Sequence, residues 1–206
     1  MTTATCFQRL SVVTVLHASK KDIDSAASLQ HPSGGISIVK NSSQEVAADI
    51  IRNKPEYVKN STFDIFSYVK SLSDVELKIE PLCDDISGYI EKVGDKFVIV
   101  VNSLQSPLRQ RFTLAHEFGH YSLHKADLEG KHQDTVLFRD ANEDSLGIEY
   151  AANDFAAELL IPKESFEDAI KSGKNTPKQL SNLFQVTEKA ILYRAYKLGI
   201  IKSFPN

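Results

Sequence analysis

The segment Arg111–Lys125 reads RFTLAHEFGHYSLHK and contains the pattern His-Glu-x-x-His. The serine and proline at 106–107 are typical of the cap and first position of a helix, so we predict a helix over residues 107–124. Residues four apart on a helix lie about 40° apart in azimuth and about 6 Å apart in height. His116 and His120 therefore lean to the same side, where both imidazoles can hold one metal ion.

The residues between and beside these histidines indicate catalysis as well as metal binding. Glu117 lies about 100° round the helix from His116, too far to be a natural ligand beside the pair. Its carboxylate can instead overhang a water molecule bound to the ion. Gly119 removes a side chain next to the site, which lets another backbone or a substrate approach.

Zinc fits this pattern best. It accepts imidazole ligands, and it keeps a fourth position open when the protein supplies three ligands. We therefore expect one Zn²⁺ per chain, although manganese or iron can occupy the same ligands.

A third ligand is required, and Glu149 is the strongest candidate. It opens an apolar segment, Gly147–Leu160, that reads GIEYAANDFAAELL. Asn153 follows one turn later, where its side-chain carbonyl can accept a hydrogen bond from the free ring N–H of a zinc histidine. The alternative interpretation of Glu149 is a solvated first-turn acid that complements the helix dipole. The other candidates are Glu143, Asp144, Asp154, Glu158 and His132, and also His124, which lies too far along the helix from His116 to share its ion.

The N-terminal half predicts two helices followed by a small sheet. Ser42-Ser43-Gln44-Glu45 has the spacing of a capping box before a helix that Pro55 ends. Ser61 and Thr62 are predicted to cap a second helix, FDIFSYVKSL. Residues 75–102 then hold three short β-branched segments, VELKIEPL, DISGYIEKV and DKFVIVVN, with a hairpin turn at Val93-Gly94-Asp95. We predict a small antiparallel sheet of about three strands.

The C-terminal half predicts helices only. A second long helix over about 144–160 ends before Pro162, and Lys163–Lys171 forms a short helix that Gly173 ends. Thr176 and Thr187 are predicted to cap two further helices. The fold class is therefore α+β and mostly helical, with C-terminal helices after the last strand.

Composition narrows the functional classes. No window approaches the roughly 18 apolar residues of a membrane span, and the run LSVVTVL near the start is too brief for a signal peptide. The net charge of −3 argues against a protein that mainly coats nucleic acid. Cys6 and Cys83 are two isolated cysteines that fit a reducing cytosol, so we expect a cytoplasmic protein.

Two linked motifs carry a family resemblance. RFTLAHEFGHYSLH, followed some 25 residues later by EYAANDFAAELLIP, resembles the ImmA/IrrE family of zinc metallopeptidases. The hairpin ISGYIEKVGDKFVIVVN and the tail LFQVTEKAILYRAYKLGII look like the same family, so the resemblance covers about residues 44–200. It implies a zincin-like domain of the gluzincin type. In it His116, His120 and Glu149 bind zinc, and Glu117 is the catalytic acid and base. The family often has a further acid two residues after the ligand glutamate, where this chain has Ala151.

The resemblance also implies a function. Members are metalloendopeptidases that typically act on a transcriptional repressor, often in mobile elements or stress responses. We therefore expect a hydrolase that cleaves a repressor or similar regulatory protein at a specific site, without a membrane or nucleic-acid partner. The alternatives are a zinc-containing regulatory or DNA-binding protein without peptidase activity, and a zinc hydrolase of a non-peptide bond.

Several further residues are candidates for supporting roles. An oxyanion donor is expected, and the candidates are Tyr121, His124, Arg139 and Tyr150. His124 equally fits a partly buried residue at the end of its helix. The segment TVLFRD (135–140) is either a sheet edge for an extended substrate peptide or a surface loop.

The tail and the domain boundaries complete the expectations. Lys189, Arg194 and Lys197 suggest a DNA-reading element, but packing or docking of the protein substrate explains the tail better. We predict three parts. Residues 1–41 are a poorly defined N-terminal segment, 42–162 are the metallopeptidase domain, and 163–206 are a helical extension that packs on it or follows it.

Overall fold

A computed structural model describes residues 42–84, 86–129 and 143–203 of the chain. Within these ranges the protein is mixed α+β, with a two-stranded and a three-stranded sheet. The helices are α2 (Ser43–Asn53), α3 (Ile65–Ser71), α4 (Pro107–Glu129), α5 (Glu143–Leu160), α6 (Lys163–Lys171), α7 (Pro177–Phe184), α8 (Glu188–Lys197) and the 3-10 helix η1 (Pro55–Tyr57). The strands are β1 (Val58–Lys59), β2 (Thr62–Phe63), β3 (Val75–Glu80), β4 (Gly88–Val93) and β5 (Lys96–Asn102). The predicted N-terminal segment 1–41 and the segment TVLFRD lie outside the described residues.

Most helices begin where the sequence predicted. Ser42 forms a complete capping box with Glu45, and Thr176 forms one with Gln179. The side chain of Thr187 accepts a hydrogen bond from the backbone N–H of Ala190. These predictions are confirmed because a cap depends on residues three positions apart and not on distant partners.

The start of α3 differs from the prediction. Asn60 and Ser61 both have positive φ (49° and 63°), and they form the turn of a short β1–β2 hairpin that includes Thr62. The chain therefore becomes helical only after Asp64, whose carboxylate accepts a hydrogen bond from Ser67 N–H at 3.2 Å. Ser61 and Thr62 were the wrong choice of cap because they belong to this hairpin, in which the Thr62 hydroxyl donates to the Lys59 carbonyl at 2.7 Å.

The three-stranded sheet has the order β3-β5-β4. β4 and β5 form the predicted antiparallel hairpin, and Gly94 supplies the positive φ (62°) of its turn. β3 pairs with β5 in parallel, however, so the prediction of a wholly antiparallel sheet is wrong for this pair. The reason is the apolar character of β5, in which Phe97–Val101 are all buried. Such a strand takes the central place, and the loop after β3 must carry the chain to the far edge.

The side chain of Asn102, at the end of β5, organises that loop. It is 1% exposed, and its amide donates to the carbonyl of Ile86 at 2.8 Å. Its Oδ1 accepts hydrogen bonds from the backbone N–H groups of Leu82 and Leu104. One buried side-chain amide therefore pairs with backbone groups of the loop between β3 and β4 and of the segment after β5. Its own polar atoms are hydrogen-bonded in turn, as buried polar groups require.

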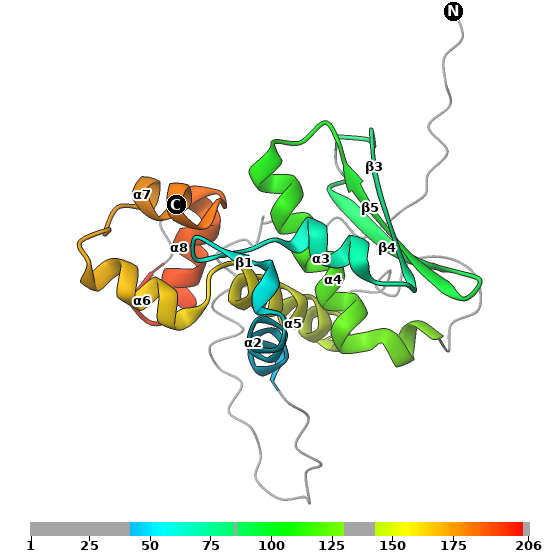
Figure 1. The fold of residues 1–206 in the computed structure, drawn as a ribbon, viewed down its shortest axis with the longest axis horizontal. Helices are drawn as coiled ribbons and strands as arrows, with labels where there is room; N and C mark the ends of the chain where they lie inside the picture. The colour runs from blue at the N-terminus through cyan, green and yellow to red at the C-terminus, as the bar shows by residue number, and fades with distance from the viewer. Residues whose placement is uncertain (1–41, 85, 130–142, 204–206) are drawn as a thin grey trace, which may run out of the picture.

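α4 and α5 form the centre of the molecule. In Figure 1 the three-stranded sheet lies on one side of this pair, and α6–α8 lie on the other. α4 packs on β4, β5 and α5, whereas α2 packs on α5. The regular part of α4 ends at His124, which has non-helical backbone angles (φ −129°, ψ 16°), and α5 ends two residues before Pro162, as predicted. None of the helices in the described ranges is both long and apolar enough to cross a membrane.

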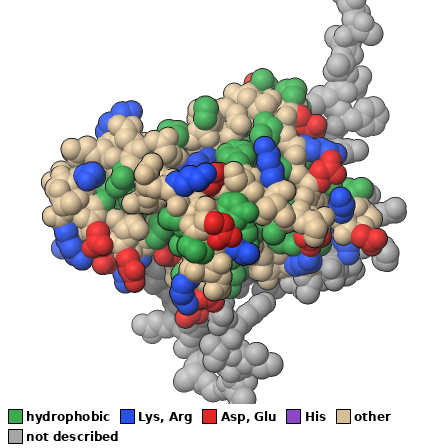
Figure 2. All heavy atoms as spheres, viewed as in Figure 1, with side chains coloured by type: hydrophobic (Ala, Val, Ile, Leu, Met, Phe, Trp, Pro, Cys, Tyr) green, Lys and Arg blue, Asp and Glu red, His purple; other side chains and the backbone are tan. Residues whose placement is uncertain are grey.

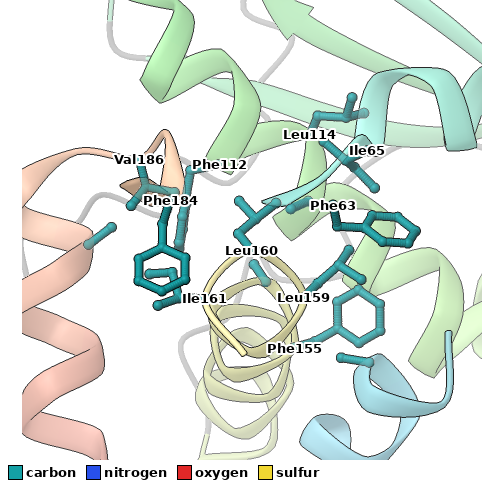
Figure 3. Packing of buried hydrophobic residues seen from close by; sticks show 14 of the residues in the cluster. Phe63, Ile65, Phe112, Leu114, Phe155, Leu159, Leu160, Ile161, Phe184 and Val186 are labelled. Carbon is teal, nitrogen blue, oxygen red and sulfur yellow. The ribbon is translucent and has the colours of Figure 1, made fainter. Parts of the chain in front are cut away.

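One hydrophobic cluster joins these elements to the C-terminal helices. Figure 3 shows Phe112 of α4 and Leu160 and Ile161 at the end of α5 beside Phe184 and Val186 of the α7–α8 turn. All five side chains are buried. The helices after residue 162 thus share a core with α4, which carries the histidines, and with α5. The division of the chain into domains at residues 41 and 162 stays a prediction.

Arg111 of α4 adds polar bonds to this junction. Its guanidinium donates to the carbonyls of Phe63 (2.7 Å), Phe184 (3.2 Å) and Gln185 (3.4 Å). Burial lowers the pKa of Arg111 to about 10, so the side chain is still charged at neutral pH. One cation therefore connects β2, α4 and the end of α7.

We expect Arg111→Met to lower the free energy of unfolding by about 2–4 kcal/mol, because the carbonyls of the buried residues Phe63 and Phe184 lose their donor. The matched control is Arg52→Met, since Arg52 is 71% exposed and pairs with Asp49 on the surface. That control is expected to change stability by less than about 1 kcal/mol. Urea denaturation of the three proteins measures both values. Equal effects of the two substitutions would contradict the role of Arg111.

Candidate metal centre

Three side chains from two helices converge on one point. His116 and His120 come from α4, and their Nε2 atoms lie 3.1 Å apart. Glu149 comes from α5, with Oε2 3.4 Å from His116 Nε2 and Oε1 3.4 Å from His120 Nε2. Within the described ranges these residues are the one group of His, Cys, Asp or Glu side chains arranged to hold a metal ion.

The spacing of these atoms fits zinc. Around a tetrahedral Zn²⁺ with bonds of about 2.0–2.1 Å, ligand atoms lie roughly 3.3–3.4 Å from one another. The two Nε2 atoms, 3.1 Å apart, are close to such an edge, and each lies 3.4 Å from one of the two Glu149 oxygens. Two imidazoles and a carboxylate are also a common zinc donor set.

Asn153 sets the tautomer of His116. Its Oδ1 lies 3.1 Å from His116 Nδ1, one helical turn after Glu149 on α5. An amide oxygen can only accept, so Nδ1 carries the proton and Nε2 presents its lone pair to the group. A ligand histidine is commonly oriented by an acceptor in this way.

The pKa values of the two histidines shift in opposite directions, although burial acts to lower both. Burial, together with the neighbouring His116, lowers the pKa of His120 to about 3, so this ring is neutral. Burial also acts against a charge on His116, but the hydrogen bond with Glu149 and the charges of Glu117 and Glu149 outweigh it. The pKa of His116 is therefore raised. The two carboxylates thus favour one positive charge at this point, which is the electrostatic requirement of a cation site.

Glu117 lies beside the group without being part of it. Its side chain is buried, with 8% of the residue exposed. Burial raises its pKa to about 7, and the charge of Glu149 adds to the rise while His116 acts against it. A carboxyl group with a pKa near 7 can both accept and donate a proton at neutral pH.

Gly119 allows the two helices to approach each other. A Cβ atom at this position would lie 3.1 Å from Phe155 Cδ1 and 3.2 Å from the carbonyl oxygen of Ala152. Gly119 therefore makes room for the backbone of α5. The sequence analysis had left open whether this room serves another backbone or a substrate. Ala152 is the residue before Asn153, so the close approach occurs where α5 contacts His116.

The structure describes three of the four oxyanion candidates, and one of them, Tyr121, is hydrogen-bonded to a residue outside the group. The hydroxyl of Tyr121 donates to Asp74 Oδ2 at 2.8 Å, and its ring stacks on Phe118. The ring of His124 lies 6.3 Å from that of His120, at the break in α4. Tyr150 is half-buried and follows Glu149 directly. Arg139 lies outside the described residues.

The remaining third-ligand candidates divide into two sets. Asp154 and Glu158 bind residues of α8, as described below. Nothing is described of His132 or of the side chains of Glu143 and Asp144. The pairing of Asp154 and Glu158 with α8 is the feature that the sequence analysis missed. The signal was present, because two acids four residues apart on α5 are complementary to basic residues at positions 194 and 197.

The fold and this group define the class: an α+β protein in which a His-Glu-x-x-His helix and a glutamate from a second helix form a group that can hold a metal ion. The peptidase M78 family model, described as the IrrE N-terminal-like domain, matches residues 82–196, more than half of the chain. The chain belongs to this family, and the resemblance carried by its two motifs is confirmed.

One solved structure extends the comparison to the fold. A Mycobacterium tuberculosis transcriptional regulator is similar, with a TM-score of 0.55 and 16% sequence identity. The match covers 75% of this chain and 46% of that chain, so this chain spans less than half of the regulator's length. At this identity the likeness concerns the fold alone. The search of curated proteins found no match.

Alanine substitutions at Gly119 and Gly147 test whether the metal centre needs the close packing of α4 on α5. A Cβ at Gly147 would meet nothing within 4 Å, whereas a Cβ at Gly119 would crowd Phe155 and Ala152. Both alanine substitutions gain about 1 kcal/mol of helix propensity. We expect Gly147→Ala to be stabilising and Gly119→Ala to weaken Zn²⁺ binding about 10-fold, because α5 must move. Competition with a chromophoric chelator measures the affinity, and equal Zn²⁺ binding by the two variants would contradict this account.

Glu117 predicts how the stability of the metal-free protein depends on pH. Its pKa is raised from 4.5 to about 7, so the folded protein binds more protons than the unfolded chain between these values. Its contribution to stability is therefore lost as the pH rises through this window. At about pH 8, Glu117→Gln is expected to raise the free energy of unfolding by about 2–3 kcal/mol, and near pH 4 to leave it almost unchanged.

Urea denaturation in the presence of a chelator measures this difference. The matched control is Glu76→Gln, because Glu76 is an exposed glutamate on β3. A Glu117→Gln difference that stays constant with pH would show that Glu117 has no raised pKa.

Proposed function

We propose that this protein is a zinc-dependent endopeptidase of the cytoplasm that cleaves a transcriptional repressor or similar regulatory protein at a specific site. The observation that carries the proposal is the convergence of His116, His120 and Glu149 beside a buried Glu117 with a pKa of about 7. Family membership supports a metallopeptidase. The repressor as substrate rests on the family resemblance, and a regulatory role agrees with the description of the structural neighbour as a transcriptional regulator.

Each residue of the group has a distinct task in this proposal. His116, His120 and Glu149 would hold the ion, and Asn153 keeps the proton of His116 on Nδ1. When bound, Zn²⁺ supplies Lewis acidity, which makes a water molecule acidic near neutral pH and polarises a carbonyl oxygen. Glu117 then takes the proton of the attacking water and passes it to the leaving amine of the peptide bond. Its pKa of about 7 suits both transfers.

The main alternative is a zinc-containing regulatory or DNA-binding protein without peptidase activity. A purely structural zinc site is closed by a fourth protein ligand, whereas the group in the described ranges has three members. A structural site also has no use for a buried carboxyl group at position 117.

The surface also supports the proposal over DNA binding. Of the basic residues that suggested a DNA-reading helix, Arg194 binds Glu158 and Lys197 binds Asp154. On the face drawn in Figure 2, Lys and Arg side chains are interspersed with Asp and Glu. A nucleic-acid-binding face usually gathers basic residues along one helix or stripe.

Glu117→Gln is the decisive variant. We expect it to keep the fold and bind Zn²⁺, and to reduce cleavage at least about 100-fold, because the proton acceptor is lost. The assay incubates wild-type protein and variant with the proteins encoded by neighbouring genes, with and without a chelator, and follows cleavage by mass spectrometry. Glu76→Gln is the matched control. Cleavage by Glu117→Gln at the wild-type rate would rule out the proposed mechanism.

A further inference from the structure

Arg194 of α8 is a cation buried in the core. Its side chain is 2% exposed and forms an ion pair with Glu158 of α5. Its Nε also donates to the carbonyl of Ile161 at 3.0 Å. Ile161 directly follows the last residue of α5, where helix carbonyls lack partners and a cation is favourable. Arg194 therefore binds α5 through both a side chain and the end of its backbone.

Asp154 of α5 binds two further residues of α8. Its Oδ1 accepts a hydrogen bond from the hydroxyl of Tyr193 at 3.2 Å, and its Oδ2 lies 3.0 Å from Lys197 Nζ. Burial and the neighbouring carboxylate raise the pKa of Tyr193, so the hydroxyl stays protonated and donates. We call these five residues, Tyr193, Arg194, Lys197, Asp154 and Glu158, the α8–α5 clamp.

The clamp and the metal centre use opposite sides of α5. A helix turns about 100° per residue, so Asp154 lies about 140° and Glu158 about 180° round the axis from Glu149. Glu149 and Asn153 contact the histidines of α4 on one side. Asp154 and Glu158 contact α8 on the other. α5 is therefore held from both sides by directional bonds.

We infer that α8 is a positioning element for the metal centre: Tyr193, Arg194 and Lys197 fix the rotation of α5 and its position along its axis, and with them the place of the Glu149 carboxylate. This inference rests on the proposed metal centre. To share an ion with the histidines, the Glu149 carboxylate must stay close to the Nε2 atoms of both His116 and His120. A small rotation of α5 would move the carboxylate towards one of these atoms and away from the other. The bond to Ile161 opposes sliding, and the bonds to Asp154 and Glu158 oppose rotation.

Cobalt(II) titration of the full chain tests this inference, since Co²⁺ reports both affinity and coordination geometry through its visible absorption. We expect Asp154→Ala to lower Co²⁺ affinity 10- to 100-fold and to alter the shape of the absorption spectrum. This variant leaves no buried unpaired charge, because Lys197 is 33% exposed and can reach water. The double variant Arg194→Met/Glu158→Leu replaces the buried ion pair by apolar side chains, so that the chain can fold without it. It is expected to show the same loss.

The matched control loosens the C-terminal helices without touching the clamp. Phe166 of α6 is fully buried and packs on Phe184, so Phe166→Leu lowers stability while leaving every clamp bond in place. We expect this variant to bind Co²⁺ with the wild-type affinity and spectrum at temperatures where it is folded.

The outcomes separate the inference from the function on which it rests. Wild-type affinity and spectrum in Asp154→Ala and in the double variant would overturn the positioning role but leave the metal centre intact. An equal loss of affinity in Phe166→Leu would also overturn it, because the effect would then be general destabilisation. A wild-type protein that binds no Co²⁺ would overturn the metal centre and the positioning role together.

Discussion

The close crossing of α4 and α5 is the constraint on which the rest of the structure depends. Gly119 lets the α5 backbone at Ala152 come within the distance that a Cβ would occupy. Only at this separation can the Glu149 carboxylate reach the imidazoles of His116 and His120. The same packing removes the group from water, and this burial raises the pKa of Glu117 and lowers that of His120. The close packing of α4 and α5 is thus the common cause of the arrangement of the three side chains and of the shifted pKa values.

Two arginines, one on α4 and one on α8, connect the crossing helices to the C-terminal helices. Arg111 donates to backbone carbonyls at the end of α7, and Arg194 donates to one at the end of α5. Carbonyls at the end of a helix have no partner within the helix, so a buried guanidinium there satisfies groups that would otherwise be costly to bury. Through these contacts the C-terminal helices belong to the same core as the metal centre, although they contribute no ligand to it.

The sequence predicted best those features that depend on neighbouring residues. The caps at Ser42, Thr176 and Thr187 and the turn at Gly94 each require partners within about four positions. The pairing of two histidines on one helix has the same local character. Asn153 could be predicted because its relation to Glu149 is also one helical turn.

The features that the sequence did not predict depend on distant partners. The parallel pairing of β3 with β5 follows from competition among strands for the central position, which no single segment encodes. Tyr121 was a candidate for the site, but Asp74, 47 positions upstream, binds its hydroxyl. The basic residues of α8 suggested an external partner by their charge alone, whereas the acids that bind them lie within α5.

The charge of α5 explains why such partners are needed. Its sequence, EDSLGIEYAANDFAAELL, contains acidic residues but no lysine or arginine. A helix of this composition can be buried at the centre of a protein only if cations reach it from other elements, because an unpaired buried carboxylate is strongly unfavourable. On the α8 side Arg194 and Lys197 meet this requirement. On the α4 side the raised pKa of His116 shows the same demand for positive charge beside Glu149, and a divalent ion held by two neutral imidazoles would satisfy it.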